Sequence, residues 1–285
     1  MKAHNRRAFL TTIGAAALGI ASGCNGGANG AALPARRKLS RIGLQLYTVR
    51  DQMKADLPGT LSRVAAISYR EVEFAGYFGQ TPSEIRELLS RNGLTSPSTH
   101  VPLDSMRKDW RKTLDNAKAI GHSWVTIPWV AENERTLDGW KRLAAEFNAA
   151  ATEAKAAGLR FGYHNHDFEL RKTGNVVPLD LLLAETDPAL VDFEMDLYWV
   201  VQGGGDPLDY FTRFGKRFPM VHVKDSAGPP DHLMTSVGQG RIDFKSIFAE
   251  GGKAGIRHYF VEHDQPADPM ASIRASYDHL RALEF

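Results

Sequence analysis

The chain has 285 residues, 43% of them hydrophobic and 24% charged, a composition that is typical of a globular protein rather than a disordered or fibrous one. Its formal net charge is +2. Residues 1–24 hold three basic residues and no acidic one, so the remainder carries 32 basic residues (three fewer than the total of 35) against 33 acidic ones. A nearly neutral body carries no general electrostatic surface for nucleic acid. Cys24 is the only cysteine, which excludes an internal disulfide and a cysteine-based zinc site.

The N-terminal 24 residues have the pattern of an export signal. The pair Arg6-Arg7 is followed by Phe9, Leu10 and a weakly apolar stretch that ends near Ile20. This stretch is too short and too weakly apolar to span a membrane, and the arginine pair resembles the twin-arginine signal that an export receptor reads. The alternative is a generic basic segment of a signal peptide. We expect the twin-arginine export machinery to carry the protein out of the cytoplasm, to the periplasm.

The end of this signal carries a second feature, the sequence Ala21-Ser22-Gly23-Cys24. It resembles a bacterial lipoprotein cleavage site, at which the cysteine takes a lipid that anchors the mature protein to a membrane. The alternative is an unmodified Cys24 in a signal that is cut nearer Ala28 to Ala32. Residues 25–40 are predicted to form a flexible linker, and residues 41–285 the folded domain.

From residue 42 onward, β-rich runs alternate with helical patterns. The predicted strands are Ile42–Val49, Tyr69–Ala75, Thr95–Val101, Trp124–Val130, Arg160–His166, Val191–Val200, Met220–Asp225 and His258–Asp264. The predicted helices are Leu61–Ile67, Pro82–Asn92, Lys108–Ile120, Leu137–Ala157, Pro178–Glu185, Pro207–Lys216, Phe244–Lys253 and Pro269–Leu283. This alternation predicts an α/β protein with a single (β/α)8 TIM barrel. The alternative, a doubly wound open sheet, normally has a glycine-rich turn after its first strand, and Thr48-Val49-Arg50-Asp51 contains no glycine.

Polar residues gather at the C-terminal ends of the predicted strands, where barrel enzymes have their active sites. They include Glu73, His100, His164, His166, Glu194, Asp196, His222, Lys224, Glu262 and Asp264. Because alternate residues of a strand share a face, four strand ends can each direct an imidazole or a carboxylate at the barrel axis. Two imidazoles and two carboxylates suit one divalent metal: Mn²⁺, Co²⁺, Fe²⁺ or Zn²⁺. The alternative for each single residue is a structural hydrogen bond.

Five motifs carry a resemblance to a known family. They are YHNHDFE (163–169), FEMDLYWV (193–200), VHVKD (221–225), SVGQGRIDF (236–244) and YFVEHD (259–264). With these motifs the chain resembles the sugar phosphate isomerase/epimerase family, the xylose-isomerase-like TIM barrels, from Ile42 to about Leu283. That family includes ketose 3-epimerases, inosose dehydratase, dehydroshikimate dehydratase and an apurinic endonuclease branch.

The resemblance implies a divalent metal held by Asp196, His222 and Glu262. The family's fourth ligand is usually a glutamate, and His164 stands at that position here. In the ketose epimerases this glutamate and the counterpart of Glu262 are the two bases, one on each face of the substrate. A metal-bound imidazole has no free lone pair, so epimerisation by that pair is in doubt. Isomerisation or elimination of water or an alcohol, each with a single base next to a carbonyl, stays open.

The resemblance and the strand positions together give candidate roles. Glu262 is the candidate base, Lys224 the group that stabilises developing negative charge, and His166 a further catalytic group. The predicted substrate-binding residues are His100, Glu169 and Glu73. For Lys224 the alternative is a salt bridge with Glu194 or Asp225, and for the others it is support of a metal ligand. Phe78, Trp129, Tyr198 and Trp199 suit stacking on sugar faces, with packing in the barrel as the alternative.

These observations favour a metal-dependent sugar isomerase/epimerase that acts on a sugar or polyol. A metal-dependent lyase or dehydratase, acting on an inosose or a 3-keto-glycoside, is the alternative. A non-catalytic sugar-binding lipoprotein is a more remote one. DNA repair would need a basic groove, which the charge balance does not provide, so we expect no nucleic-acid partner.

Overall fold

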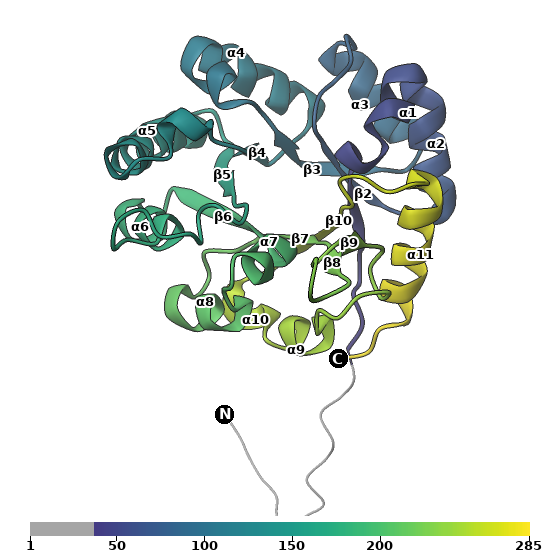
Figure 1. Ribbon diagram of the computed structural model, residues 1–285. Helices are drawn as coiled ribbons and strands as arrows, with labels where there is room; N and C mark the ends of the chain where they lie inside the picture. The colour runs from purple at the N-terminus through teal and green to yellow at the C-terminus, as the bar shows by residue number, and fades with distance from the viewer. Residues whose placement is uncertain (1–36) are drawn as a thin grey trace, which may run out of the picture. The chain divides into compact units, whose positions relative to one another are not determined.

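The computed structural model describes residues 37–285. The predictions that concern the signal peptide and Cys24 lie outside the described residues. Eight parallel strands close into a barrel in the order β1-β10-β7-β6-β5-β4-β3-β2, and helices surround it (Figure 1). This confirms the single (β/α)8 barrel.

The barrel strands are β1 (Gly43–Gln45), β2 (Glu71–Phe74), β3 (Thr95–His100), β4 (Trp124–Ile127), β5 (Arg160–His164), β6 (Val191–Asp196), β7 (Met220–Val223) and β10 (His258–Val261). The α-helices are α1 (Arg50–Ala55), α2 (Leu57–Ile67), α3 (Pro82–Arg91), α4 (Leu103–Ile120), α5 (Leu137–Ala156), α6 (Pro178–Glu185), α7 (Leu197–Gln202), α8 (Pro207–Phe214), α9 (Phe244–Ala249), α10 (Gly251–Ala254) and α11 (Pro269–Ala282). Short 3₁₀ helices span Leu46–Val49 and Glu132–Glu134, and a small hairpin joins β8 (Asp225–Ser226) to β9 (Met234–Thr235).

The first strand closes the barrel because it pairs with β2 on one side and β10 on the other. Gly43 lies opposite Glu71 and Phe260. A Cβ at Gly43 would stand 2.5 Å from the Phe260 ring, so only glycine lets this ring fill the barrel. Phe260 forms an inner apolar cluster with Trp124 and Met220. Polar side chains line the interior toward the C-terminal ends of the strands.

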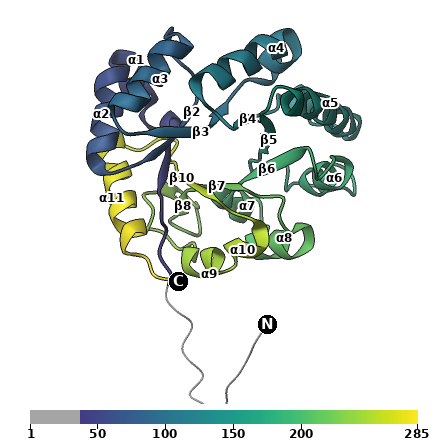
Figure 2. The ribbon, with the colours of Figure 1, turned by 180° about the vertical axis from the view of Figure 1, so that it is seen from behind.

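The apolar faces of the helices cover the outside of the strands. In α5, Trp140, Leu143 and Phe147 are buried, and the Phe147 ring lies 5.2 Å from that of Phe161 in β5. The ring of helices is complete in the view from behind (Figure 2). None of the described helices is long and apolar enough to cross a membrane.

Several elements differ in extent from the prediction. The sixth strand ends at Asp196 rather than Val200, because the Asp196 side chain accepts a hydrogen bond from Trp199 N and starts α7. The predicted helix Phe244–Lys253 is divided into α9 and α10. The helix α1 and the β8–β9 hairpin were not predicted.

The two ends of the described chain meet at the base of the barrel, where the strands begin. Arg37 N donates to Phe285 O at 2.7 Å, and Phe285 N donates to Arg37 O at 3.0 Å. Leu39 packs against the core. Residues 37–40, at the end of the predicted linker, thus lie against the barrel.

Candidate active site

A cavity of about 420 Å³ lies at the C-terminal ends of the strands. Its polar lining residues include His100, His164, His166, Lys224, Glu262 and Asp264. A volume of this size is typical of small-molecule sites. We call this cavity the mouth of the barrel.

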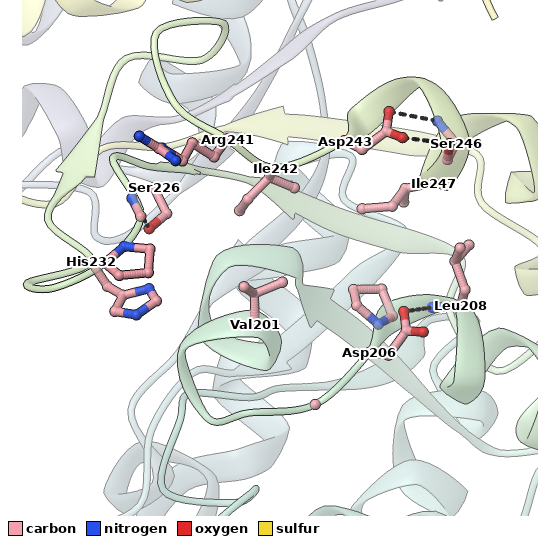
Figure 3. Close-up of a pocket in the computed structure, with 14 residues that line it drawn as sticks. Val201, Asp206, Leu208, Ser226, His232, Arg241, Ile242, Asp243, Ser246 and Ile247 are labelled. Carbon is pink, nitrogen blue, oxygen red and sulfur yellow. Dashed lines mark hydrogen bonds between the residues drawn. The ribbon is translucent and has the colours of Figure 1, made fainter.

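A second cavity, of about 460 Å³, lies between the loop before α8 and the loop before α9 (Figure 3). Its two carboxylates are used to begin helices: Asp206 accepts from Leu208 N and Asp243 from Ser246 N. None of the predicted site residues lines it. The mouth is therefore the candidate active site.

The four predicted metal ligands lie close together, with His164 and Glu262 in the lining of the mouth and Asp196 and His222 fully buried beside them. His164 and Asp196 are the last residues of β5 and β6. His222 lies in β7, and Glu262 directly follows β10. His222 Nδ1 lies 2.8 Å from Glu262 Oε2 and 3.9 Å from Asp196 Oδ2. His164 Nε2 lies 3.7 Å from Asp196 Oδ2.

The donor atoms of this group fit a divalent metal. Among the described residues, Asp196 Oδ2 is buried and makes no hydrogen bond, although buried polar atoms are nearly always paired. His164 Nδ1 is also buried without a hydrogen bond, but it faces Glu194 Oε2 at 3.5 Å, whereas Nε2 faces Asp196. Asp196, His222 and Glu262 each offer a ligand atom within 4.8 Å of the others. Burial lowers the pKa of His164 to about 3, so its imidazole is neutral, as a ligand must be.

Lys224 places a positive charge among these carboxylates. Its Nζ lies 2.7 Å from Glu262 Oε2, 2.8 Å from Asp264 Oδ1 and 3.1 Å from Asp196 Oδ2. Of these three ion pairs, the one with Asp264 also has hydrogen-bonding geometry. Burial disfavours the charge, but the three carboxylates raise the pKa of Lys224 well above its ordinary value. The lysine is therefore an ammonium at neutral pH.

These contacts also answer the question that the sequence left open for Lys224. Its carboxylate partners are not Glu194 or Asp225. They are the three carboxylates that lie at the ends of β6 and β10, the two strands on either side of β7.

A layer of carboxylates and imidazoles lies directly below the predicted ligands. His222 Nε2 is 2.7 Å from Glu73 Oε2 and 3.2 Å from Glu194 Oε2. Gln45 Nε2 donates to Glu73 at 2.7 Å, and His100 Nε2 is 2.6 Å from Glu194 Oε2. These contacts hold Nε2 of His222 and leave Nδ1 facing the mouth, as outer partners of metal-bound histidines do.

This layer sets the charge of its own members. Burial disfavours charge on His222, but the carboxylates of Glu194 and Glu262 raise its pKa well above the ordinary value, so a metal that binds Nδ1 would have to displace a proton from this ring. Burial would raise the pKa of Glu194, but His222 and His100 hold it well below the ordinary value. His100, His164, Glu194 and His222 form a second group of ligand types within 4.8 Å of one another, which shares His222 with the first.

His166 is held in the wall of the mouth by the loop after β5. Its backbone N–H donates to Glu169 Oε2 at 2.8 Å, and Tyr163 OH donates to Glu169 Oε1. The His166 ring stacks on Phe168 with centroids 5.4 Å apart. Burial raises the pKa of Glu169 to about 7.

The structure therefore divides the predicted catalytic and substrate-binding residues. Glu262, Lys224, His166 and His100 line the mouth. Glu73 and Glu169 are fully buried behind its wall and contact other site residues, which corrects our expectation that both touch substrate. The candidate roles did not include Asp264, although it shares a strand face with Glu262, nor Tyr47, which also lines the mouth.

The comparison with known proteins agrees with this arrangement. Residues 61–283 match the family model described as the xylose isomerase-like TIM barrel. The chain belongs to this family. An inosose dehydratase from Geobacillus kaustophilus is 25% identical over 243 residues, which cover 68% of this chain and 78% of that protein.

Solved structures of the family superpose well on the barrel. A sugar phosphate isomerase/epimerase from Parabacteroides distasonis is 29% identical, with a TM-score of 0.76 over 85% of this chain and 98% of that one. The IolI protein, whose structure holds a zinc atom, has a TM-score of 0.69 over 84% of this chain and 95% of its own. At 12% identity, IolI shows the common fold alone. The chain is thus similar to sugar-modifying enzymes.

Proposed function

We propose that the protein is a divalent-metal-dependent enzyme that removes a proton next to the carbonyl group of a sugar or polyol. A bound metal would supply Lewis acidity toward the carbonyl oxygen. His164, Asp196, His222 and Glu262 would hold it. Of the outcomes open to such a site, we favour β-elimination of water or an alcohol.

The observation that carries this proposal is the one-sided placement of the carboxylates in the mouth. Glu262 and Asp264 both follow β10, whereas the β5 wall presents the imidazoles of His164 and His166. The site therefore has carboxylate bases on one face of a bound substrate. A two-base epimerisation needs a base on each face, so one-base chemistry suits this site better.

Glu262 and Lys224 can divide the work of an elimination. The pKa of Glu262 is held well below its ordinary value by Lys224 and His222, against the effect of burial, so the carboxylate is ionised and can accept the proton from carbon. Lys224 is charged and can donate a proton to the departing oxygen. The proton taken by Glu262 can then return to Lys224 over the 2.7 Å contact between them.

This geometry fixes the stereochemistry that we expect. Lys224 follows β7 and Glu262 follows β10, which are paired neighbours. The proton leaves and the leaving group is protonated on the same face of the substrate. The elimination is therefore expected to be syn.

The test combines metal analysis with a substrate screen. The purified protein is analysed for bound metal and then incubated with inososes, ketoses and 3-keto-glycosides in D₂O while NMR spectra are recorded. We expect an α,β-unsaturated ketone or its tautomer to form, together with water or an alcohol. Glu262→Gln should keep metal at reduced affinity and abolish the exchange of the C–H next to the carbonyl. Exchange at the wild-type rate in Glu262→Gln would overturn the role of Glu262.

Isomerisation is the second candidate, because a single base can move a proton between neighbouring carbons on one face. The Parabacteroides relative carries this activity in its name. The same spectra distinguish the two reactions, since an isomerisation retains every oxygen of the substrate. Turnover without any deuterium exchange would contradict both and favour a hydride shift.

A further inference from the structure

The exposed large apolar side chains of the described chain all follow the C-terminal ends of barrel strands, and two of them, Tyr47 and Trp129, line the mouth. These side chains are Tyr47, Phe78, Trp129 and Leu233, with 42%, 42%, 49% and 66% of their surface exposed. Each lies in a segment that follows the C-terminal end of a barrel strand, after β1, β2, β4 and β7. Exposed apolar groups gathered around a site indicate a binding surface.

Trp129 separates two hollows. One is the mouth, and the other is an adjoining cavity of about 400 Å³ between the loops that follow β3 and β4. Pro102, Pro128 and Trp129 line both cavities. A ligand that fills the mouth can therefore extend along the indole ring into the second hollow.

The indole ring is held in place by its neighbours. The Arg135 guanidinium lies over it, 5.1 Å from the ring, and also over Phe168 at 3.4 Å. Arg135 Nε is anchored on Val130 O at 3.0 Å. Phe168 in turn stacks on His166, which lines the mouth. Such support fixes the ring before a ligand arrives, which lowers the cost of binding.

The chemistry of the second hollow favours an uncharged ring. Pro102, Leu103, Pro128 and Ala131 give it apolar walls. Its two carboxylates are already paired, Asp104 with Lys108 at 3.0 Å and Glu134 with Arg107 at 2.6 Å. No free cation among its described lining residues is placed to receive a phosphate or a carboxylate.

We propose that this second hollow is an outer subsite, which binds the second ring of a glycoside by stacking on Trp129. The inference deepens the proposed function and, for its reaction, rests on it: the substrate class is a keto-glycoside rather than a free ketose or inosose. The C–H next to the carbonyl breaks, a C=C bond forms, and the glycosidic C–O bond breaks. The departing oxygen takes a proton from Lys224, and the second ring leaves from the outer subsite as a neutral alcohol.

The test measures binding without turnover. The unreactive ligands methyl β-glucoside and phenyl β-glucoside share the glucose ring. They differ only in the group attached to it, which is a methyl group in one and a phenyl ring in the other. Their dissociation constants are measured by calorimetry for the wild type, Trp129→Ala, Trp129→Phe and the control Leu233→Ala, which removes an exposed apolar side chain that lines neither hollow. We expect the phenyl compound to bind the wild type about fivefold more tightly, because aromatic stacking contributes about 1 kcal/mol and a tenfold change corresponds to about 1.4 kcal/mol. This ratio should fall to about one in Trp129→Ala, return largely in Trp129→Phe and persist in Leu233→Ala.

Three results would overturn the subsite. The first is that Trp129→Ala changes the affinity of neither ligand. The second is that it weakens the affinity of both ligands by the same factor, and the third is a dimer in light scattering that Trp129→Ala dissociates. The outcome is independent of the proposed reaction. A ratio that depends on Trp129 without turnover of any keto sugar leaves the subsite standing and refutes the elimination. Turnover of a keto sugar, together with a binding ratio that is unchanged in Trp129→Ala, would support the elimination and refute the subsite.

Discussion

The two carboxylate oxygens of Asp196 have different roles, one in starting a helix and one in the candidate active site. Oδ1 accepts from Trp199 N at 3.0 Å and so begins α7, while Oδ2 faces His164, His222 and Lys224 without a hydrogen bond. Burial raises the pKa of Asp196 to about 6, against the effect of Lys224. A group held this way is positioned by its own helix before any ligand binds.

The metal site gives a prediction at this scale. Asp196→Ala and His222→Ala should each lose the bound metal and the activity together, as measured by elemental analysis of the purified variants. Glu73→Gln is the matched control, because it neutralises a carboxylate that contacts His222 Nε2 without removing a predicted ligand, and it should weaken metal affinity by about 10- to 100-fold. Full metal content in both ligand variants would refute the assignment.

A buried histidine away from the mouth gives a second prediction. His122 Nδ1 is 2.8 Å from Ser96 O, its Nε2 is 3.0 Å from Tyr77 OH, and burial lowers its pKa to about 4. The unfolded chain binds a proton here near pH 6.5, but the folded one does not. Stability should therefore fall by about 3 kcal/mol as the pH drops from 6.5 to 4.

The variant His122→Asn isolates this effect. At pH 7.5 it should be about 1–3 kcal/mol less stable than the wild type, because a buried hydrogen-bonding group is changed. Urea unfolding at pH 7.5 and 4.5 should show a smaller difference in the free energy of unfolding between the two proteins at the lower pH. The reason is that acid destabilises only the wild type at this site. A constant difference would show that folding does not lower the pKa of His122.

At the scale of elements, one carboxylate organises the long segment after β7. Asp225 accepts hydrogen bonds from the backbone N–H groups of Ser226 (2.8 Å), Gly238 (2.9 Å), Gly240 (3.0 Å) and Ile242 (3.2 Å). A Cβ at Gly240 would stand 2.2 Å from Asp225 Oδ1, so this close approach requires glycine. The motifs VHVKD and SVGQGRIDF are thus parts of one structural unit.

Asp225→Ala should therefore destabilise the fold by about 3 kcal/mol, because it leaves one buried and three partly buried backbone hydrogen bonds without an acceptor. Asp231→Ala, an exposed residue of the same segment, should stay within about 0.5 kcal/mol of the wild type. Denaturant unfolding of both variants measures the difference. Equal stability of the two would mean that the segment reorganises around other acceptors.

At the scale of the whole molecule, we propose that the protein is exported through the Arg6-Arg7 pair and lipidated at Cys24. The double variant Arg6→Lys, Arg7→Lys should accumulate as precursor in the cytoplasm, because the receptor reads the paired arginines. Cell fractionation and immunoblotting measure this. Export of the variant at the wild-type level would refute the twin-arginine route.

The fold and much of the candidate site follow from the sequence, because strand alternation and parity are local properties. They place Glu262 with Asp264 and His222 with Lys224 on shared faces. They carry no information on depth in the barrel, so the burial of Glu73 and Glu169 behind the mouth required the packed structure. The position of the Trp129 ring depends likewise on its contact with Arg135, which also packs on Phe168. No local sequence pattern predicts these contacts.

The hydrogen bonds between Arg37 and Phe285 bring the ends of the barrel together at its base. A short peptide could join these ends, and new ends could be opened in an exposed loop. Such a circular permutant would keep every strand neighbour and leave the mouth untouched. The order in which the strands leave the ribosome could then be varied while the active site stays the same.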